Sequence, residues 1–310
     1  SLINMYAKCG FLGEAQELLE SIQFRNVVSW STVISGYVRQ GHGHKALDCF
    51  ERMQREGIFP DAIAFTCILK ACGIIGDIDK GKEVHHEIIT MGLVLEEDIV
   101  LSNALVDMYV KCGHLPDAQR VHDQLRARDI VSWNALIAGY AQQGQGHEAL
   151  VSFRLMRREG YCPDVVTLTC ILKGCGSIED TTKGKELHCE IVDRGLLSEN
   201  TLLGNSLVDM YAKCGEFEIA KKVHEELPFR DIISWNALIS GYTDWGHSRE
   251  ALNCFEQLQC EGQNPDVVTF TCILKACGSM RAIQEGKEVH NVISQRGLLE
   301  KDSMLGISLV

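Results

Sequence analysis

Apolar residues return at helical spacing throughout the chain. In residues 29–40 they take the i, i+3, i+4 and i+7 positions of one buried helical face, at Trp30, Val33, Ile34 and Tyr37. Ser29 is predicted to be the N-cap of this helix, and the run from Gly41 to Gly43 to end it. A second apolar face follows at Ala46, Leu47, Phe50 and Met53. No stretch shows the alternation of a half-buried strand, so the pattern predicts helix–turn–helix hairpins and an all-α fold.

The hairpins recur as repeats of three lengths. A Ser-Trp dipeptide returns with its tryptophan at Trp30, Trp133 and Trp235, in steps of 103 and 102 residues. Each complete step contains repeats of 35, 36 or 37, and 31 residues, with boundaries at 1–26 (partial), 27–61, 62–98, 99–129, 130–164, 165–200, 201–231, 232–266, 267–302 and 303–310 (partial). One hairpin cannot bury its apolar face alone, so neighbouring hairpins must stack. We therefore expect a single solenoid domain over residues 1–310.

Both ends of the chain fall inside a repeat. Residues 1–6 match residues 206–211, and residues 305–310 stop where residues 203–208 would continue. We expect the sequence to be a fragment of a longer array.

Composition narrows the class of protein. With 45% hydrophobic and 23% charged residues the chain is not a disordered tail, and no run approaches the length of a membrane span, so no membrane partner is expected. The net charge of −12 argues against a protein that coats nucleic acid non-specifically. The charges are unevenly spread, however. The first helices of the hairpins carry a net +4, which leaves −16 on second helices and turns. The basic residues are Lys8, Arg39, Lys70, Lys111, Lys173, Lys213 and Lys275, and the acidic residues are Asp107, Asp209 and Asp244. The first helices are therefore expected to face any polyanionic partner.

Cysteine and histidine patterns do not predict catalysis. Eleven of the 14 cysteines lie at repeat-equivalent positions, and none forms Cys-x-x-Cys. Pairs such as Cys67 and Cys72 point about 140° apart on a helix, which suits core packing better than a shared metal. His-x-Glu occurs at residues 85–87, 188–190 and 224–226, but the Pro-Cys-x-x-Cys half of the zinc deaminase signature is missing. We predict no metal, no cofactor and no enzymatic activity for this chain.

Several motifs resemble plant pentatricopeptide repeat proteins. They are [Val/Ile]-Ser-Trp-Asn-Ala-Leu-Ile-x-Gly-Tyr at 131–140 and 233–242, Asn-Ala-Leu-Val-Asp-Met-Tyr-x-Lys-Cys-Gly at 103–113, and Gly-Lys-Glu-x-His at 81–85, 184–188 and 286–290. The rotation of repeat lengths is similar to the subclass with ordinary, long and short (PLS) repeats. The resemblance implies a right-handed superhelical solenoid that binds single-stranded RNA, with each repeat facing one base.

The resemblance also implies which residues read the bases, namely the fifth and last residues of each repeat. In the 35- and 31-residue repeats these are Ser31 with Asp61, Asn103 with Asp129, Asn134 with Asp164, Asn205 with Asp231, and Asn236 with Asp266. The partial first repeat retains Asn26, and the long repeats give Thr66 with Asp98, Thr169 with Asn200, and Thr271 with Asp302. At 100° per residue, Ser31 falls just outside the stripe containing Trp30, so a short polar side chain there is expected to stay out of the core. Val28, Val131 and Ile233 lie on nearly the same face and are expected to sandwich bases.

By the family's code, Asn with Asp reads uridine, and Ser or Thr with Asp reads guanosine. With the RNA 5′ end at the N-terminus, residues 27–302 would read G-(G)-U-U-(A)-U-U-(G), with the long repeats in parentheses. The implied role is site recognition for C-to-U editing or other processing of mitochondrial or chloroplast transcripts, with partner proteins of an editing complex supplying the deaminase. A protein–protein interaction scaffold is the alternative class, and an inactive array is a third.

Overall fold

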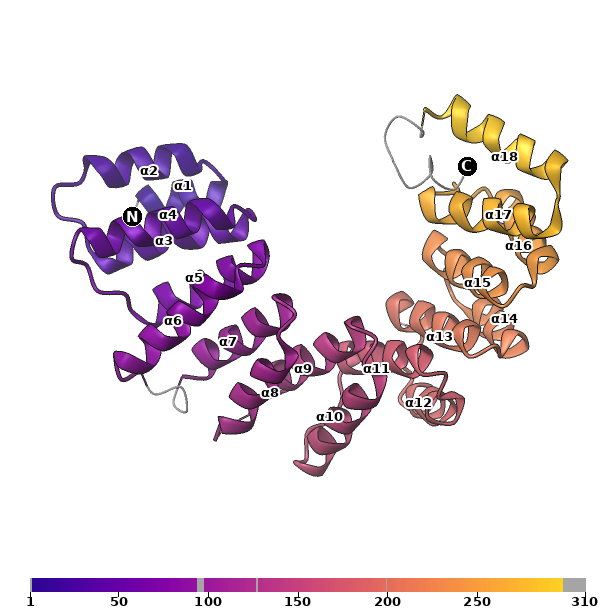
Figure 1. Cartoon of the computed structure of the whole chain (residues 1–310), viewed down its shortest axis with the longest axis horizontal. Coiled ribbons are helices and arrows are strands. Elements are labelled where there is room, and N and C mark those ends of the chain that lie inside the picture. The colour runs from indigo at the N-terminus through magenta and orange to yellow at the C-terminus, as the bar shows by residue number, and fades with distance from the viewer. Residues whose placement is uncertain (1, 94–97, 127, 199, 298–310) are drawn as a thin grey trace. The chain divides into compact units, whose positions relative to one another are not determined.

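The computed structural model describes residues 2–93, 98–126, 128–198 and 200–297. In these ranges the chain forms α-helices connected by turns, with no strand (Figure 1). The first helices of the hairpins are α1 (Leu2–Cys9), α3 (Val27–Arg39), α5 (Ala62–Ile75), α7 (Ile99–Lys111), α9 (Ile130–Gln142), α11 (Val165–Ser177), α13 (Thr201–Lys213), α15 (Ile232–Asp244) and α17 (Val267–Met280). The second helices are α2 (Leu12–Ser21), α4 (Gly43–Arg55), α6 (Ile78–Thr90), α8 (Leu115–Gln124), α10 (Gly146–Arg158), α12 (Thr181–Asp193), α14 (Phe217–Glu226), α16 (Ser248–Cys260) and α18 (Ile283–Gln295). The all-α hairpin architecture predicted from the sequence is confirmed.

The chain divides into two compact units. Unit 1 comprises residues 1–143 and 152–162, and unit 2 comprises residues 144–151 and 163–310. In unit 1 the first helices α1, α3, α5, α7 and α9 pack in succession, and in unit 2 the same holds for α11, α13, α15 and α17. A second helix such as α4 or α14 packs against the first helix of its own hairpin and that of the next one. Each unit therefore has a continuous layer of first helices backed by second helices, as a helical solenoid requires.

Helix α3 begins three residues earlier than we predicted. Asn26, not Ser29, is the N-cap of α3: the Asn26 side chain accepts a hydrogen bond from the Ser29 backbone N–H at 2.9 Å. Ser29 is the third helical residue, and its hydroxyl accepts from the Asn26 backbone N–H, which completes a capping box. The prediction was wrong because a serine near a helix start can fill either role, and the better cap lay further upstream.

The tight turns and close helix contacts depend on glycine. Gly41, between α3 and α4, has a φ of +76°, a conformation that residues with a β-carbon rarely adopt. Gly81 on α6 faces Met108 of α7, and a β-carbon on Gly81 would lie only 2.4 Å from the Met108 sulfur. Gly184 and Met210 repeat this contact at 2.4 Å in unit 2. Small residues at this position thus let the next hairpin approach closely.

The cysteines divide between core and surface. All fourteen are free thiols; the five buried ones are Cys49, Cys72, Cys175, Cys254 and Cys277, and four others are exposed. Burial raises the pKa of the Cys72 and Cys175 thiols to about 12, so both are neutral apolar fillers at neutral pH. Within the described ranges no cluster of three or more His, Cys, Asp or Glu side chains is arranged to hold a metal ion. No described helix combines the length and apolarity needed to cross a bilayer.

Candidate nucleic-acid interface

An exposed aliphatic side chain occupies the second position of every complete repeat. Val28, Val131 and Ile233, which the sequence indicated, are 65%, 56% and 58% exposed. The structure adds five repeat equivalents that we had not singled out: Ile63, Val100, Val166, Leu202 and Val268, each more than half exposed. They were already readable from the sequence, since each follows the closing residue of the preceding repeat by two positions. Exposed aliphatic groups at regular spacing make these positions candidates for contact with another molecule.

The closing residue of most repeats caps the next first helix. Its side-chain oxygen accepts a hydrogen bond from a backbone N–H in the first turn of that helix, as we see for Asn26, Asp61, Asp98, Asp129, Asp164, Asp231 and Asp266. Asn200 differs, because its amide donates to the Leu196 carbonyl at 3.0 Å and makes no side-chain cap on α13. The capping bonds fix each of these side chains at one end of the first-helix layer.

Within each unit the asparagine at the fifth position is held by the carboxylate at the last position. The Nδ2 of Asn205 donates to both oxygens of Asp231 at 3.0 Å. Asn236 makes the same pair of bonds to Asp266 at 3.0 Å, and Asn103 bonds Asp129 at 3.0 and 3.2 Å. These partners lie 26 or 30 residues apart in the sequence. The remaining predicted pair is divided between the units: Asn134 lies on α9 of unit 1, and Asp164 caps α11 of unit 2.

The pairing orients each amide. A carboxylate only accepts hydrogen bonds, so Nδ2 must face it and Oδ1 must point away. The Oδ1 atoms of Asn103 and Asn205 are buried and accept no hydrogen bond within the described part of the chain. Asn205 is only 4% exposed, which contradicts our expectation that these side chains stay out of the core. The expectation failed because a single helix shows only its own stripe, whereas the neighbouring repeat covers the fifth position from the side.

The first reading position lies in a small pocket. A cavity of about 290 Å³ is lined by Val28 and Ile63, the second-position residues of two successive repeats, and by Ser31 and Asp61. Ser31 is 5% exposed, and its hydroxyl oxygen has no hydrogen-bond partner among the described residues. The other residues that line the cavity include two with cationic side chains. They are Asn4, Lys8, Thr32, Ser35 and Arg39. Two aliphatic walls, a polar floor and flanking cations make a pocket suited to a flat, polar-edged, anionic ligand.

The fifth-position threonines of the long repeats are arranged differently. Thr169 and Thr271 donate their hydroxyl hydrogens to the carbonyl oxygens of Val165 and Val267, four residues back, at 2.8 Å. Thr66 is buried at the same position. These hydroxyls therefore present mainly acceptor lone pairs outward. Asp302, the predicted partner of Thr271, lies outside the described residues.

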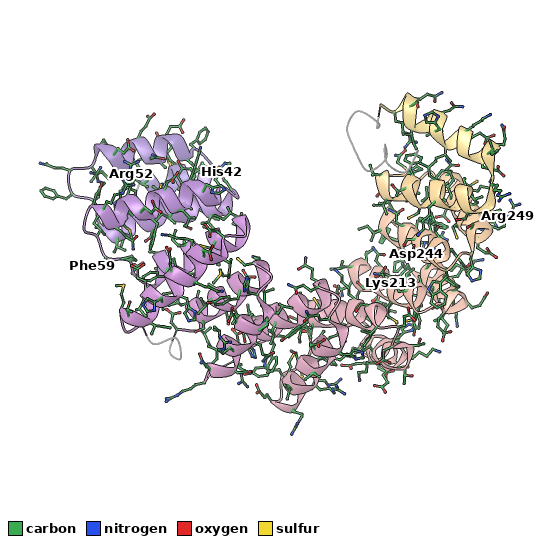
Figure 2. All side chains as sticks on the ribbon, in the orientation of Figure 1. His42, Arg52, Phe59, Lys213, Asp244 and Arg249 are labelled. Atoms are coloured by element: carbon green, nitrogen blue, oxygen red, sulfur yellow. The ribbon has the colours of Figure 1, made fainter. Side chains whose placement is uncertain are left out.

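The charges of the first helices differ between the units. All three acidic residues on these helices form ion pairs: Asp107 with Lys111 at 2.8 Å, Asp209 with Lys213 at 2.7 Å, and Asp244 with Lys275 at 2.7 Å. The hydrogen bond to Asp244 raises the pKa of Lys275. In unit 2, Lys213 and Asp244 lie near each other on α13 and α15, whereas Arg249 from α16 points to another side (Figure 2).

Unit 1 begins with cations that have no acidic partner. Lys8, Arg39 and Lys70 hold the repeat positions of Lys213, Asp244 and Lys275, and none of the three forms an ion pair with a described residue. Asn4, which stands where Asp209 stands in unit 2, cannot neutralise Lys8. Three of the four first-helix cations that form no ion pair with a described residue therefore lie at the N-terminal end of unit 1, and the fourth, Lys173, lies on α11 of unit 2.

The histidines of the His-x-Glu triplets pack against aromatic rings. His85 and His188 hydrogen-bond the hydroxyl groups of Tyr109 and Tyr211 at 2.9 and 3.0 Å. His224 lies edge-on to Trp235 with 4.3 Å between ring centroids, and His122 repeats the arrangement with Trp133. Burial lowers the pKa of both His122 and His224 to about 4, so their imidazoles are neutral at neutral pH. These contacts are structural.

Sequence profiles identify the repeats. The profile described as "PPR repeat family" matches residues 25–73, 128–177 and 230–279, and the one described as "PPR repeat" matches residues 1–27, 63–93, 100–130 and 205–232. The chain belongs to the pentatricopeptide repeat family. The further division into ordinary, long and short pentatricopeptide repeats stays a prediction.

Named relatives of this pentatricopeptide repeat chain come from Arabidopsis thaliana. A chloroplastic pentatricopeptide repeat-containing protein is 35% identical over 299 residues, covering 96% of this chain and 48% of the relative. A mitochondrial one is 36% identical over 310 residues, covering 100% of this chain and 30% of the relative. The chain thus spans less than half the length of these relatives. Among solved structures, the pentatricopeptide repeat protein PPR10 in complex with an 18-nt psaJ RNA element matches 93% of this chain and 43% of its own, with a TM-score of 0.79 and 22% identity, which establishes the shared fold.

Proposed function

We propose that this pentatricopeptide repeat chain binds single-stranded RNA sequence-selectively, with one base opposite each repeat. PPR10, which shares the fold, was crystallised with an RNA element, and family membership makes RNA the first partner to test. The chain recognises its partner through hydrogen bonds and aliphatic contacts and performs no chemistry on it.

The observation that carries the proposal is the pocket around Ser31. Val28 and Ile63 supply two flat aliphatic walls from successive repeats, and Ser31 and Asp61 supply hydrogen-bonding groups between them. A base placed there would keep its faces in apolar contact while its edge meets polar atoms, which is how proteins read unstacked bases. Lys8 and Arg39 line the same pocket and suit the phosphate backbone.

The asparagine sites extend the argument along the array. At Asn103 and Asn205 the amide oxygen is a buried acceptor that has no partner among the described residues, and such an atom is stabilised by a ligand that brings an N–H group. The N3–H of uracil is such a donor, whereas N3 of cytosine is an acceptor. Uridine opposite these two repeats is therefore the base that the chemistry favours.

A reciprocal exchange tests base reading. Ser31→Asn should move the preference at the first base from guanosine toward uridine, and Asn205→Ser should move the sixth base from uridine toward guanosine, each by about tenfold in relative affinity. The measurement is a gel-shift titration of both variants and the wild-type chain with eight-base RNAs that differ only at base 1 or base 6. Each variant serves as the control for the other, because only the base opposite the exchanged residue should respond.

Failure would take a clear form. Binding that is equal for all bases at both positions would contradict base reading, and binding that is absent at low salt would favour the protein-scaffold alternative. RNA binding by this chain should also weaken as salt rises, since phosphate contacts release counterions.

We further propose that the recognised sites lie in mitochondrial or chloroplast transcripts and mark positions for C-to-U editing or other processing. The organellar names of the relatives support the location. An editing-complex protein would then supply the deaminase. The test is sequencing of organellar transcripts from a plant lacking the full-length protein: a lost edit close to a segment matching G-(G)-U-U-(A)-U-U-(G) supports the role, and unchanged editing and processing contradict it.

A further inference from the structure

Two asparagine sites with the same carboxylate geometry differ at the amide oxygen. In both, Nδ2 donates to the two oxygens of the closing Asp at 3.0 Å, Asn205 to Asp231 and Asn236 to Asp266. Asn205 Oδ1 accepts no hydrogen bond among the described residues, whereas Asn236 Oδ1 lies 2.7 Å from the hydroxyl oxygen of Thr269. One acceptor is open in the free protein, and the other is occupied.

The difference comes from the third residue of the following repeat. Where this residue is serine, its hydroxyl donates to the backbone carbonyl of the capping residue, as Ser29, Ser132 and Ser234 do at 2.7, 2.9 and 2.9 Å. Thr269 occupies the same position, but its hydroxyl is turned toward Asn236. The β-methyl of threonine restricts χ1, so threonine does not share the full rotamer freedom of serine at this position.

The single hydroxyl hydrogen of Thr269 has two acceptors in reach. They are Asn236 Oδ1 at 2.7 Å and Asp266 Oδ1 at 2.9 Å. Asp266 Oδ1 already accepts the Thr269 backbone N–H at 2.9 Å and the Asn236 amide at 3.0 Å. A hydrogen directed at the carboxylate would leave the hydroxyl and the amide oxygen facing each other at 2.7 Å with no hydrogen between them. The hydrogen therefore lies between Thr269 and Asn236.

We propose that Thr269 is a specificity-determining residue that relaxes base discrimination at Asn236. This inference rests on the proposed base reading. At Asn205 a uracil N3–H would pair the open amide oxygen, and a cytosine would leave it unpaired and facing another acceptor, which is heavily penalised in a buried site. At Asn236 the Thr269 hydroxyl keeps the oxygen paired with either base. Cytidine is therefore tolerated better opposite Asn236 than opposite Asn205.

The test is an exchange of the two third-position residues in the full chain. Thr269→Ser should return the hydroxyl to the Asp266 carbonyl, as in the three serine sites, and Ser234→Thr should place a hydroxyl on Asn205 Oδ1. RNAs with uridine or cytidine at base 7 report on Asn236, and those at base 6 report on Asn205. We expect the uridine-to-cytidine affinity ratio to rise about fivefold at base 7 in Thr269→Ser and to fall about fivefold at base 6 in Ser234→Thr.

Each outcome decides a separate point. Because the ratio compares two RNAs on one variant, a general loss of stability affects both affinities equally and cancels. Thr269→Val, which removes the hydroxyl, should also raise the uridine-to-cytidine ratio at base 7. If the wild-type chain binds uridine more tightly than cytidine at base 6 but neither exchange changes the uridine-to-cytidine affinity ratio, the role of Thr269 is refuted and base reading is retained. If wild-type chain separates them at neither base, the proposed function itself fails. Equal wild-type ratios at bases 6 and 7 also overturn the inference.

Discussion

The N-terminal end of unit 1 and the C-terminal end of unit 2 are built from equivalent repeats with different side chains. Lys8, Arg39 and Lys70 form an unneutralised charge row in the first, while the equivalent row in the second contains the Asp244–Lys275 ion pair at 2.7 Å. Repeat periodicity therefore fixes where a side chain lies but not what charge it presents. If the chain binds RNA, the electrostatic part of the affinity should come mainly from unit 1 and the base contacts from both.

The surroundings of the buried tryptophan also differ between the first and the last 35-residue repeat. Arg52 lies over Trp30, 5.7 Å from the ring centroid, and also pairs with Glu20 at 2.9 Å. At the equivalent place around Trp235 stands Gln257, beside a cavity of about 310 Å³. The residue at the position of His224 is Leu19 in the first repeat. The two ends thus differ in buried ionisable groups as well as in surface charge.

The largest expected effect concerns His224 and pH. Burial lowers its pKa from 6.5 in the unfolded chain to about 4 in the folded one, so the unfolded state binds the proton more readily between these values. This histidine therefore leaves the free energy of unfolding unchanged above pH 6.5. As the pH falls from 6.5 toward 4, it lowers the free energy of unfolding by about 1.4 kcal/mol per pH unit. His224→Leu, which installs the residue of the first repeat, should remove this loss. Urea unfolding at pH 7, 6 and 5 measures the difference from wild type.

A second buried histidine tests the same explanation. His122→Leu should behave like His224→Leu because burial lowers its pKa to about 4 as well. Parallel profiles for wild type and both buried-site variants would contradict the structural explanation.

Removing a closing carboxylate should cost more at the C-terminal end than at the N-terminal end. Asp61→Ala loses the cap on α5, worth about 1 kcal/mol. Asp266→Ala loses a cap and also leaves the Asn236 amide without its partner, so we expect about 2 kcal/mol. Urea or thermal unfolding of the two variants compares them directly. Equal losses would mean that the amide pairing adds nothing to stability.

Exchanging the central residues of the charge rows should shift RNA affinity. Arg39→Asp should weaken binding about tenfold at low salt and flatten the dependence of log K on log salt by about 0.7, the value for one phosphate contact on a single strand. Asp244→Arg should do the reverse. Salt titrations of both variants with the same RNA provide the measurement, and Arg249→Asp on another side of unit 2 is the control that should change little. Comparable weakening by Arg249→Asp would show that only net charge matters.

The smallest expected effect comes from the arginine over the tryptophan. Arg52→Gln should destabilise the chain by about 0.5–1 kcal/mol through the lost cation–π contact with Trp30, and Gln257→Arg should stabilise it by about 0.5 kcal/mol by filling the cavity at Trp235. Glu225, the counterpart of Glu20, is available to pair with the new arginine. Chemical unfolding at pH 7 detects both changes. A destabilising Gln257→Arg would indicate that Lys221 and Arg230, which line this cavity, outweigh the ring.

Periodicity in the sequence was sufficient to predict the fold. The helical stripe around Trp30 and the repeat of its neighbours predicted hairpins that stack, because both depend on spacing within one helix. The pairing of Asn205 with Asp231 agrees with the resemblance, which brought together the fifth and last residues of a repeat. Those two features are periodic, so one sequence contains several copies of the signal.

Other features depended on contacts between successive helices, which spacing within one helix does not report. The burial of Asn205 arises from the neighbouring repeat, and the Lys275–Asp244 pair joins residues 31 positions apart. The hydrogen bond from the Thr269 hydroxyl to Asn236 likewise joins two repeats, across 33 positions of the sequence. The N-cap was wrongly assigned to Ser29 for a different reason, since two polar residues three positions apart, Asn26 and Ser29, could each cap the helix.

The dual role of the closing carboxylate limits how this array can be recombined. Asp231 ends one repeat and holds the asparagine of that same repeat, and it also caps the first helix of the next repeat, so it belongs to two hairpins at once. A hairpin transplanted between turns would carry its own asparagine away from its original partner, or would leave behind the cap of its successor. Insertion or deletion of repeats should therefore preserve function only when the exchanged segment ends with a residue that satisfies both neighbours, and the junction, rather than the hairpin, sets which arrays can be assembled.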